Sequence, residues 1–350
     1  MILSVTSVPL WFFSLHLAPI ALSSAENSRG SPRDVFRLQA FPDEPDFLSS
    51  RLSNYLTFWS GTIRAMSEQN RRPILITGVH GQLGRALSAL FASRDIQFEG
   101  RDIDTLDICD GAAVTRWIQR SRPTTVINCA AFTAVDDCES KEEQARLVNG
   151  SSVGHLASAC NEVGARLVQI STDYVFAGDG NTPYAVDDPV NPVGAYGRTK
   201  LVGEELARTA RNHLIVRTAW LYGHGGRNFV EAIRGQIEAG AESLKVVADQ
   251  QGCPTFCNDL AGAILDLLDV GTDGIVHAVN TGSTTWHGFA VAIAEHLGAD
   301  VRILPVATEE FPRPAPRPRY SVLDTSRLEA VLGRALPTWQ DALQRYLEEA

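Results

Sequence analysis

The feature that most restricts the fold of this chain is an apolar run that leads into a glycine-rich turn. Residues 74–77 are mostly apolar, glycines follow at Gly78, Gly81 and Gly84, and residues 85–91 continue with helical periodicity. This order of strand, turn and helix is a variant of the dinucleotide-binding fingerprint, in which glycines permit a sharp turn and close approach of a pyrophosphate. An ordinary glycine-rich loop is the alternative, and the flanking pattern favours the nucleotide site.

From residue 73 onward, apolar runs alternate with segments of helical period, which predicts a doubly wound, parallel (Rossmann-type) α/β sheet. Strands are expected at 74–77, 96–99, 124–128, 166–171, 213–218 and 244–247, and helices at 82–93, 111–121, 141–163, 195–211 and 228–239. Beyond residue 220 we expect helices at 258–269, 286–297 and 338–349, a strand at 275–279 and a proline-rich loop at 305–318. A Rossmann domain is therefore expected at 71–225, to which 244–270 could belong, and mainly a smaller C-terminal α/β substrate lobe at 226–350.

A tyrosine and a lysine four residues apart supply candidate catalytic groups. Tyr196 and Lys200 lie in a predicted helix, where residues i and i+4 share a face. A phenol has an unperturbed pKa of about 10, and a neighbouring ammonium would favour its anion. Such a pair is suited to protonating a carbonyl oxygen while the carbon accepts hydride. The same spacing also occurs on exposed helix faces, so the assignment depends on the rest of the chain.

Composition limits the partners of the protein. The chain has 350 residues and a net charge of -10, which argues against nucleic-acid binding because such surfaces need a basic patch. Arg313, Arg317 and Arg319 form a local cluster among prolines, which is either a solvated loop or a clamp for a phosphorylated ligand. The six cysteines have no metal-binding spacing, so we expect reduced thiols in a cytoplasmic protein without a bound metal.

The first 65 residues do not match the remainder. Residues 4–22 are apolar, but no Lys or Arg precedes them and prolines interrupt them, so no membrane association is expected. Residues 23–70 show no sustained period and are rich in Ser, Pro and charge, as in disordered segments. Met66 lies just before the first strand. We therefore interpret residues 1–70 as an extension that is disordered or comes from an upstream start assignment; a genuine export or anchoring segment is the alternative.

Several motifs occur in the order and at the intervals of one enzyme family. They are Asn128–Asp136, Asn149, Ser171–Gly178, Tyr196–Glu204, Arg217–Gly223, Asp249–Thr255 and Thr285–Trp286. From about residue 73 to the C-terminus, the chain resembles the extended short-chain dehydrogenases/reductases, and within them the branch that reduces dTDP-4-dehydro-6-deoxy-L-mannose. The resemblance implies NAD(P)H-dependent reduction of this nucleotide sugar to dTDP-L-rhamnose, the last step of dTDP-rhamnose biosynthesis.

The resemblance also implies roles for individual residues. Thr172 would bond the substrate carbonyl, Tyr196 would protonate it, and Lys200 would hold the nicotinamide ribose. Cofactor contacts are expected from Gly78, Gly81, Gln82, Leu83, Gly84, Arg101, Asp102, Asp107, Ile108, Ala130, Ala131, Thr133 and Asn149, together with Tyr196 and Lys200. Substrate contacts are expected from Thr133, Val135, Thr172, Asp173, Trp220 and Arg317. Without the resemblance, Trp220 would be assigned to the core and Asn149 to a solvent-facing helix position.

Two positions depart from the family pattern. Phe132 stands where members commonly have His, and Ala86 stands where some members have an acidic residue that binds a metal at a dimer interface. We therefore carry over neither that metal nor that dimer. A monomer or homodimer is expected, with a small nucleotide sugar as its partner.

The end of the second strand determines the choice of cofactor. A carboxylate there binds the ribose 2′-OH of NAD, whereas an arginine favours the 2′-phosphate of NADP. Arg101 and Asp102 offer both groups, and Asp102 lies near the expected ~20 residues beyond Gly78. We expect NADPH, with NADH tolerated.

Two other functions are compatible with parts of this pattern. A sugar-nucleotide epimerase or dehydratase of the same superfamily keeps the glycine turn, Tyr196 and Lys200, but retains its cofactor and catalyses no net oxidation. A non-catalytic regulatory subunit resembling that of methionine adenosyltransferase is disfavoured, because Thr172, Tyr196, Lys200 and Trp220 are all present.

Overall fold

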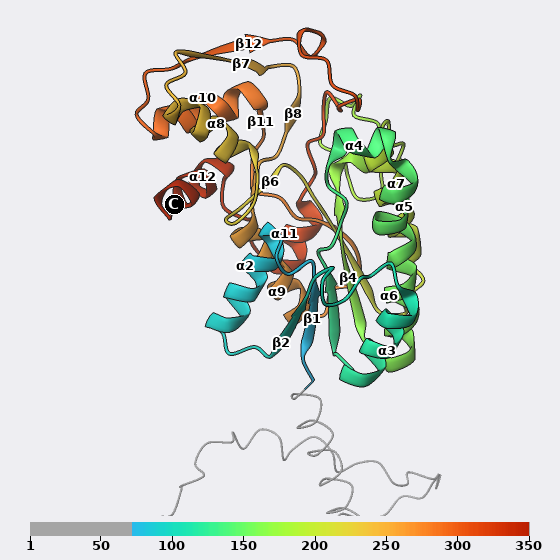
Figure 1. Ribbon diagram of the computed structural model, residues 1–350. Helices are drawn as coiled ribbons and strands as arrows, with labels where there is room; N and C mark the ends of the chain where they lie inside the picture. Colours follow the sequence, from blue (N-terminus) through green and yellow to red (C-terminus); the bar gives the residue numbers. More distant parts are fainter. Residues whose placement is uncertain (1–71, 350) are drawn as a thin grey trace, which may run out of the picture. The chain divides into compact units, whose positions relative to one another are not determined.

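The computed structural model describes residues 72–349. The interpretation of residues 1–70, including a start at Met66, lies outside the described residues. Within them, a central sheet of six parallel strands carries helices on both faces, and a smaller lobe with its own helices and strands lies beside it (Figure 1). The doubly wound α/β fold expected from the sequence is confirmed.

The strand order of the central sheet is β10-β5-β4-β3-β1-β2, with every pair parallel. The strands are β1 (Ile74–Thr77), β2 (Phe98–Arg101), β3 (Thr125–Asn128), β4 (Arg166–Thr172), β5 (His213–Thr218) and β10 (Gly274–His277). The chain proceeds from β1 to β2 on one side and then crosses to β3 on the other. In doubly wound sheets, ligands bind beyond the carboxyl ends of the strands at this reversal. The topology therefore places a binding site beyond the ends of β1 and β3.

Helices cover both faces of this sheet (Figure 1). One face carries α2 (Gln82–Ser93), α9 (Cys257–Asp269) and α11 (Ser326–Leu332), and the other carries α3 (Gly111–Ser121), α6 (Ser152–Val163) and α7 (Ala195–Ala207). Successive strand residues alternate between the two cores: Ile76 and Ile127 belong to the first, and Leu75 and Val126 to the second. Because both cores are apolar, the inner strands appear in the sequence as uninterrupted apolar runs.

The single helix predicted at 141–163 is divided in the structure. It consists of α5 (Glu142–Arg146), the π turn η2 (Leu147–Ser151) and α6. Helix α7 approaches this turn so closely that a Cβ atom at Gly203 would lie 2.1 Å from the carbonyl oxygen of Asn149. A π turn accommodates one extra residue within a helix, and apolar periodicity does not reveal it.

The sixth strand of the sheet comes from a later segment than expected. The predicted strand at 244–247 is β7 (Ser243–Val247), which pairs in parallel with β12 (Arg302–Val306) in the lobe. The strand expected in the lobe at 275–279 is instead β10, which pairs with β5 in the central sheet. Short apolar runs do not reveal which sheet they join. Because the chain crosses between sheet and lobe more than once, the division into domains at residue 225 stays a proposal.

The C-terminal lobe has an apolar core of its own. It is formed by α8 (Phe229–Glu238), α10 (Trp286–His296) and α12 (Trp339–Glu348) together with β7 and β12. Two short strand pairs accompany them: β6 (Leu221–Tyr222) with β9 (Thr255–Phe256), and β8 (Gln251–Gly252) with β11 (Thr284–Thr285). In Figure 1 the lobe lies toward the carboxyl ends of the sheet strands, so it can cover a ligand bound there.

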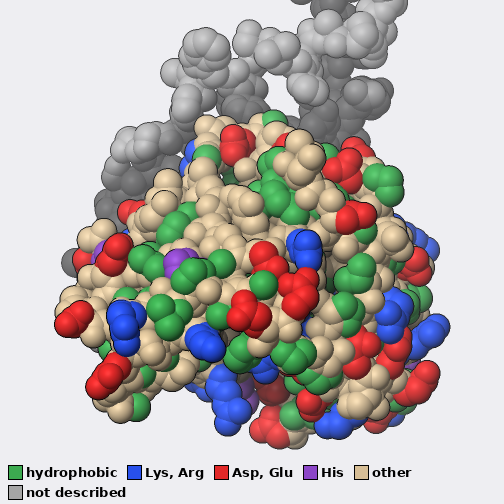
Figure 2. All heavy atoms as spheres, turned by 90° about the horizontal axis from the view of Figure 1, so that it is seen from above, with side chains coloured by type: hydrophobic (Ala, Val, Ile, Leu, Met, Phe, Trp, Pro, Cys, Tyr) green, Lys and Arg blue, Asp and Glu red, His purple; other side chains and the backbone are tan. Residues whose placement is uncertain are grey.

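The charge distribution and the hydropathy of the helices bear on which partners the protein can bind. On the face shown in Figure 2, acidic and basic side chains are interspersed. None of the helices within residues 72–349 combines the length and hydropathy that a bilayer crossing requires.

A buried ion pair fastens α7 to the sheet. Glu204 on α7 is 0% exposed and Arg217 on β5 is 1% exposed, and the guanidinium donates to the two carboxylate oxygens at 2.9 and 2.8 Å. The hydroxyl of Ser171 on β4 donates to the same carboxylate at 2.6 Å. One side chain of α7 therefore binds two neighbouring strands just before their carboxyl ends.

Glu204→Gln should destabilise the protein strongly, because it leaves the guanidinium of Arg217 buried without a countercharge. Breaking a buried pair in this way costs about 3–5 kcal/mol of the free energy of unfolding, which urea unfolding followed by circular dichroism would measure. The matched control is Glu142→Gln, which breaks the ion pair with Arg198 on the outer side of α7. Both partners are more than 40% exposed, so this variant should lose less than about 1 kcal/mol of the free energy of unfolding. Equal losses for the two variants would contradict the anchoring role.

Candidate active site

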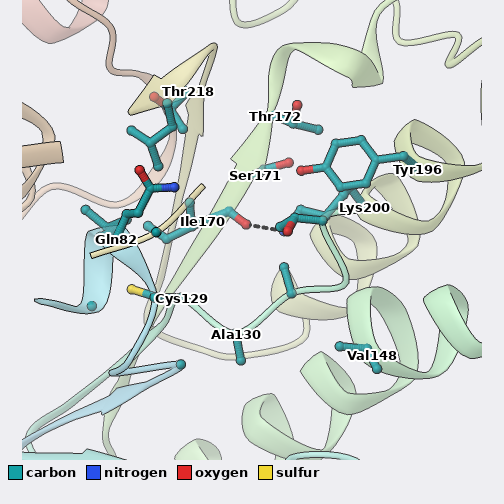
Figure 3. Close-up of a pocket in the computed structure, with 18 of the residues that line it drawn as sticks. Gln82, Cys129, Ala130, Val148, Ile170, Ser171, Thr172, Tyr196, Lys200 and Thr218 are labelled. Carbon is teal, nitrogen blue, oxygen red and sulfur yellow. Dashed lines mark hydrogen bonds between the residues drawn. The ribbon is translucent and has the colours of Figure 1, made fainter. Parts of the chain in front are cut away.

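A cavity of about 1080 Å³ opens at the carboxyl ends of β1, β3, β4 and β5, where the strand order places a ligand. Figure 3 shows part of its wall, with Tyr196 and Lys200 from α7 facing the end of β4. The predicted site residues that line it are Gly78, Gly81, Gln82, Leu83, Gly84, Asp102, Asp107, Ile108, Ala130, Ala131, Thr133, Val135, Thr172, Asp173, Tyr196, Lys200, Trp220 and Arg317. The structure thus brings these residues together, whereas Arg101 and Asn149 lie outside the lining.

The glycine turn has the backbone needed to receive a phosphate. Gly78 has a φ of 65°, and a Cβ atom there would lie 2.6 Å from the backbone nitrogen of Ala130, so glycine alone fits this position. Helix α2 begins after Gly81 without a side-chain cap. Its first residues, 82–84, line the cavity, so its free N–H groups and positive dipole end are available to a ligand there. These features fit the pyrophosphate of a dinucleotide cofactor.

The two candidates for selecting the cofactor are placed differently. The carboxylate of Asp102 lines the cavity and accepts a hydrogen bond from the backbone N–H of His80 at 2.9 Å. The guanidinium of Arg101 donates to Glu99 at 3.0 Å and lies over the ring of Trp117, 5.1 Å from its centroid. Arg101 must leave this arrangement to reach a 2′-phosphate.

Lys200 and Tyr196 occupy one side of the cavity (Figure 3). Lys200 is 4% exposed, and its ammonium donates a hydrogen bond of 2.6 Å to the carbonyl oxygen of Ile170 on β4. An ammonium has three donors, so this bond fixes the Lys200 side chain and leaves further donors for a ligand. The hydroxyl of Tyr196 points toward the strand end that carries Ser171 and Thr172.

Burial determines the protonation of these two groups. Desolvation raises the pKa of the Tyr196 phenol above its usual value, and the Asp173 carboxylate raises it further, against the effect of a hydrogen bond with Thr172. Desolvation also lowers the pKa of Lys200 to about 8. The expectation that the ammonium controls the phenol is therefore corrected: desolvation dominates and the phenol keeps its proton. A proton donor in a reduction needs this state.

Asp173 is a buried carboxylate beside Thr172. It is 2% exposed, and Oδ1 accepts a hydrogen bond of 2.9 Å from the Thr172 hydroxyl. Its other oxygen, Oδ2, has no hydrogen-bond partner among the described residues. Burial raises the pKa of this carboxyl to about 6. Because buried polar atoms are normally paired, Oδ2 is suited to accept a hydrogen bond from a substrate hydroxyl.

Two tryptophans form the wall of the cavity on the lobe side. The indole rings of Trp220 and Trp286 stack with centroids 3.5 Å apart and planes inclined by 4°. Trp220 has a φ of 45°, which is uncommon for a residue with a bulky side chain and often marks a functional position. A flat, apolar surface of this kind suits the face of a sugar or base ring.

Arg317 supplies a positive charge at the cavity. Its guanidinium is 17% exposed and donates to Asp136 at 2.9 Å. The neighbouring Arg313 lies 3.9 Å from the same carboxylate, while Arg319 pairs with Glu309 away from the lining. Of the three arginines singled out in the proline-rich loop, Arg317 is the one that lines the cavity.

Asn149 supports the site from behind the cavity wall. Its side chain accepts a hydrogen bond of 2.8 Å from the backbone N–H of Phe132 and donates one of 3.2 Å to the hydroxyl of Thr199. It therefore ties the loop after β3 to α7. The resemblance implied a cofactor contact for Asn149, whereas its side-chain bonds go to Thr199 and to the loop after β3.

Sequence reasoning missed several residues of the cavity wall, among them Cys129, Thr218, Trp286 and Leu147. Cys129 follows one predicted strand and Thr218 ends another, so the rule that ligands bind beyond strand ends could have identified both. Trp286 belongs to a quoted motif but received no role. Leu147 begins the π turn, for which the sequence offers no signal.

A Rossmann sheet with an open glycine turn, beside a tyrosine and a lysine on one helix face, defines an NAD(P)-dependent oxidoreductase of the short-chain dehydrogenase/reductase class. The family described as RmlD substrate binding domain matches residues 71–350, and the chain belongs to this family. A dTDP-4-dehydrorhamnose reductase from Streptomyces griseus is 46% identical over 286 residues, which cover 79% of this chain and 94% of the relative. The resemblance stated from the sequence is thus confirmed.

Two crystal structures of dTDP-4-dehydrorhamnose reductases are similar to this fold. The enzyme from Clostridium acetobutylicum is 43% identical, with a TM-score of 0.77 over 79% of this chain and 99% of that chain. The enzyme from Bacillus anthracis, in complex with NADP, is 37% identical, with a TM-score of 0.78 over 80% of this chain and 99% of that chain.

Asp173→Asn should change the pH dependence of stability. The carboxyl has a pKa of about 6 in the folded protein and about 3.9 when unfolded, so the folded state binds the proton more tightly. Its stabilising contribution is present below about pH 4 and is lost as the pH rises to about 6. The variant lacks this dependence, so relative to wild type it should gain up to about 3 kcal/mol over this interval. Urea unfolding at several pH values would measure it; a difference independent of pH would contradict the buried charge.

Proposed function

We propose that this chain catalyses the NADPH-dependent reduction of dTDP-4-dehydro-6-deoxy-L-mannose (dTDP-4-dehydrorhamnose) to dTDP-L-rhamnose. The proposal rests on one observation: Tyr196, Lys200 and Thr172 line the same cavity as the glycine turn. Membership of the family and the activity named for the Streptomyces griseus relative support the reaction. The NADP bound to the Bacillus anthracis relative supports the cofactor.

Different residues of the cavity can perform the separate steps of the reduction. When bound, NADPH supplies the hydride for the ketone carbon of the sugar. Tyr196 gives its phenolic proton to the ketone oxygen, which is far more basic as an alkoxide than the phenolate left behind, even with the raised pKa of Tyr196. Thr172 turns its hydroxyl from Asp173 to the same oxygen and helps to orient it.

Lys200 would have two partners at once. One N–H of its ammonium is occupied by the carbonyl oxygen of Ile170, and the remaining donors can bind ribose hydroxyls. The bond to β4 fixes the ammonium at the height of the strand end. The glycine turn would hold the pyrophosphate at the N-terminus of α2, so the two ends of the dinucleotide bind different elements.

The remaining wall residues suit a nucleotide sugar. Arg317 offers a guanidinium to the pyrophosphate of the substrate, the stacked Trp220 and Trp286 offer a flat surface to a ring, and Oδ2 of Asp173 offers an acceptor to a sugar hydroxyl. Thr133 and Val135 line the facing wall. We propose these residues as the substrate site, with much of segment 226–350 covering it.

Cysteine chemistry supports the proposed cytoplasmic location. All six cysteines lie within the described residues and are free thiols. Burial raises the pKa of Cys129, Cys160 and Cys253 to about 12, so they are unreactive at neutral pH. Unpaired cysteines at this number are typical of a reducing compartment.

Purified protein should oxidise NADPH, followed by its absorbance, when dTDP-4-dehydro-6-deoxy-L-mannose is added, and should form one equivalent of dTDP-L-rhamnose. Tyr196→Phe should bind NADPH as wild type does but lose about 10²–10⁴-fold in kcat, because the proton donor is missing. Tyr174→Phe removes a phenolic oxygen from a neighbouring ring, 5.7 Å from Tyr196, and should retain most of kcat.

Two outcomes of this assay would contradict the proposed reaction, and a third would contradict only the role of Tyr196. Sugar interconversion without net NADPH oxidation would indicate an epimerase or dehydratase. Cofactor binding without any turnover would indicate a regulatory subunit. Full activity of Tyr196→Phe would remove the phenol from the mechanism and leave the reaction class intact.

Arg101→Ala should weaken NADPH selectively. The exposed ion pair with Glu99 contributes about 0.2–1 kcal/mol, whereas charge-assisted bonds to a phosphate contribute about 1.5–3 kcal/mol, so the guanidinium should move to the 2′-phosphate. We expect the Kd for NADPH to rise about tenfold and that for NADH to stay within about twofold. Asp102→Ala should do the reverse and weaken NADH. Equal effects of Arg101→Ala on both cofactors would leave Asp102 as the selecting residue.

A further inference from the structure

Thr218 is a buried residue of the cavity wall that the reaction above does not use. It ends β5, is 6% exposed and lines the cavity. Its hydroxyl oxygen has no hydrogen-bond partner among the described residues. Buried hydroxyls are normally paired within the protein or with a bound molecule. The hydroxyl of Thr218 is therefore available to a ligand in the cavity.

The register of the sheet places Thr218 beside the catalytic threonine. Thr172 and Thr218 are partners on the adjacent parallel strands β4 and β5, which lie about 4.8 Å apart in such sheets. In Figure 3, Thr218 lies across the cavity from Tyr196, on the side that carries Gln82. The amide of Gln82 donates to the carbonyl oxygen of Arg227 at 3.2 Å and accepts from Asn228 at 3.1 Å. Gln82 is thus engaged with the lobe, whereas Thr218 is free to bind.

The chemistry of the cofactor indicates which group reaches Thr218. The nicotinamide carboxamide is attached to the ring carbon next to the one that gives the hydride. A side chain beside Thr172 therefore lies close to it when the ribose is held by Lys200 on the opposite side. The hydroxyl oxygen can accept a hydrogen bond from the NH2 group of the carboxamide. We propose that Thr218 binds the carboxamide of the nicotinamide ring and so fixes which face of the ring meets the ketone, an inference that rests on the proposed nicotinamide cofactor.

Thr218→Val tests this role, because it removes the hydroxyl and keeps the shape of the side chain. Titration would give dissociation constants for NADPH and for its 3-acetylpyridine analogue, in which a methyl group replaces the carboxamide NH2. We expect the variant to bind NADPH about three- to tenfold more weakly, as for one neutral hydrogen bond, and to bind the analogue within about twofold of wild type. Thr218→Ser keeps the hydroxyl and should bind NADPH nearly as wild type does.

The stability of the free protein separates this role from a structural one. Because the hydroxyl has no partner in the protein, Thr218→Val should unfold at the same or a higher urea concentration without cofactor, and should be stabilised less than wild type by added NADPH. If Thr218→Val weakened the binding of both cofactors equally, the assignment would be overturned. A change confined to the KM of the sugar would also overturn it and would indicate that Thr218 binds the substrate. Failure of wild type to bind either cofactor would instead contradict the proposed function.

Discussion

The arrangement of the proposed catalytic residues depends on the buried ion pair between Glu204 and Arg217. Glu204 lies four residues after Lys200 and eight after Tyr196, so all three share one side of α7. Its partners Ser171 and Arg217 each precede the final threonine of a strand. Charges at this depth have no access to water, so any other docking of the helix would leave them unpaired. The pair therefore determines both the rotation of α7 and the height of Tyr196 and Lys200 above the strand ends.

Three ionisable groups of the cavity wall, Lys200, Asp173 and Tyr196, are shifted toward their neutral forms. Burial lowers the pKa of Lys200 to about 8 and raises that of Asp173 to about 6, and it raises the pKa of Tyr196 as well. Such shifts concentrate where a site excludes water. A ligand that brings hydroxyl groups to Asp173 and to Lys200 provides partners that the free protein lacks. The site is thus complementary to a polar ligand although most of its neighbouring strands are apolar.

The fold and the residues of the cavity could be predicted from the sequence to different degrees. Continuous apolar runs predicted β1 and β5 within a residue, and the glycine spacing predicted the start of α2, because these patterns reflect local geometry. The same periodicity placed β10 in the lobe and β7 in the alternating series, since the choice of sheet depends on long-range packing. Lining residues such as Trp220 followed from a resemblance. The position of Arg101 over Trp117 could not be predicted, because it depends on a contact between side chains 16 residues apart.

The π turn η2 has a consequence for how one helical segment serves two purposes. A π turn contains about one residue more than an α turn. One residue corresponds to about 100° of rotation around the helix axis. Gln144 before the turn and Leu147 at its start therefore line the cavity, while α6 after it presents Val153 and Leu156 to the core. A continuous α-helix would have to direct one of these faces elsewhere. The extra residue thus acts as a phase shift, and the same stretch of chain can build both a binding wall and a packed interior.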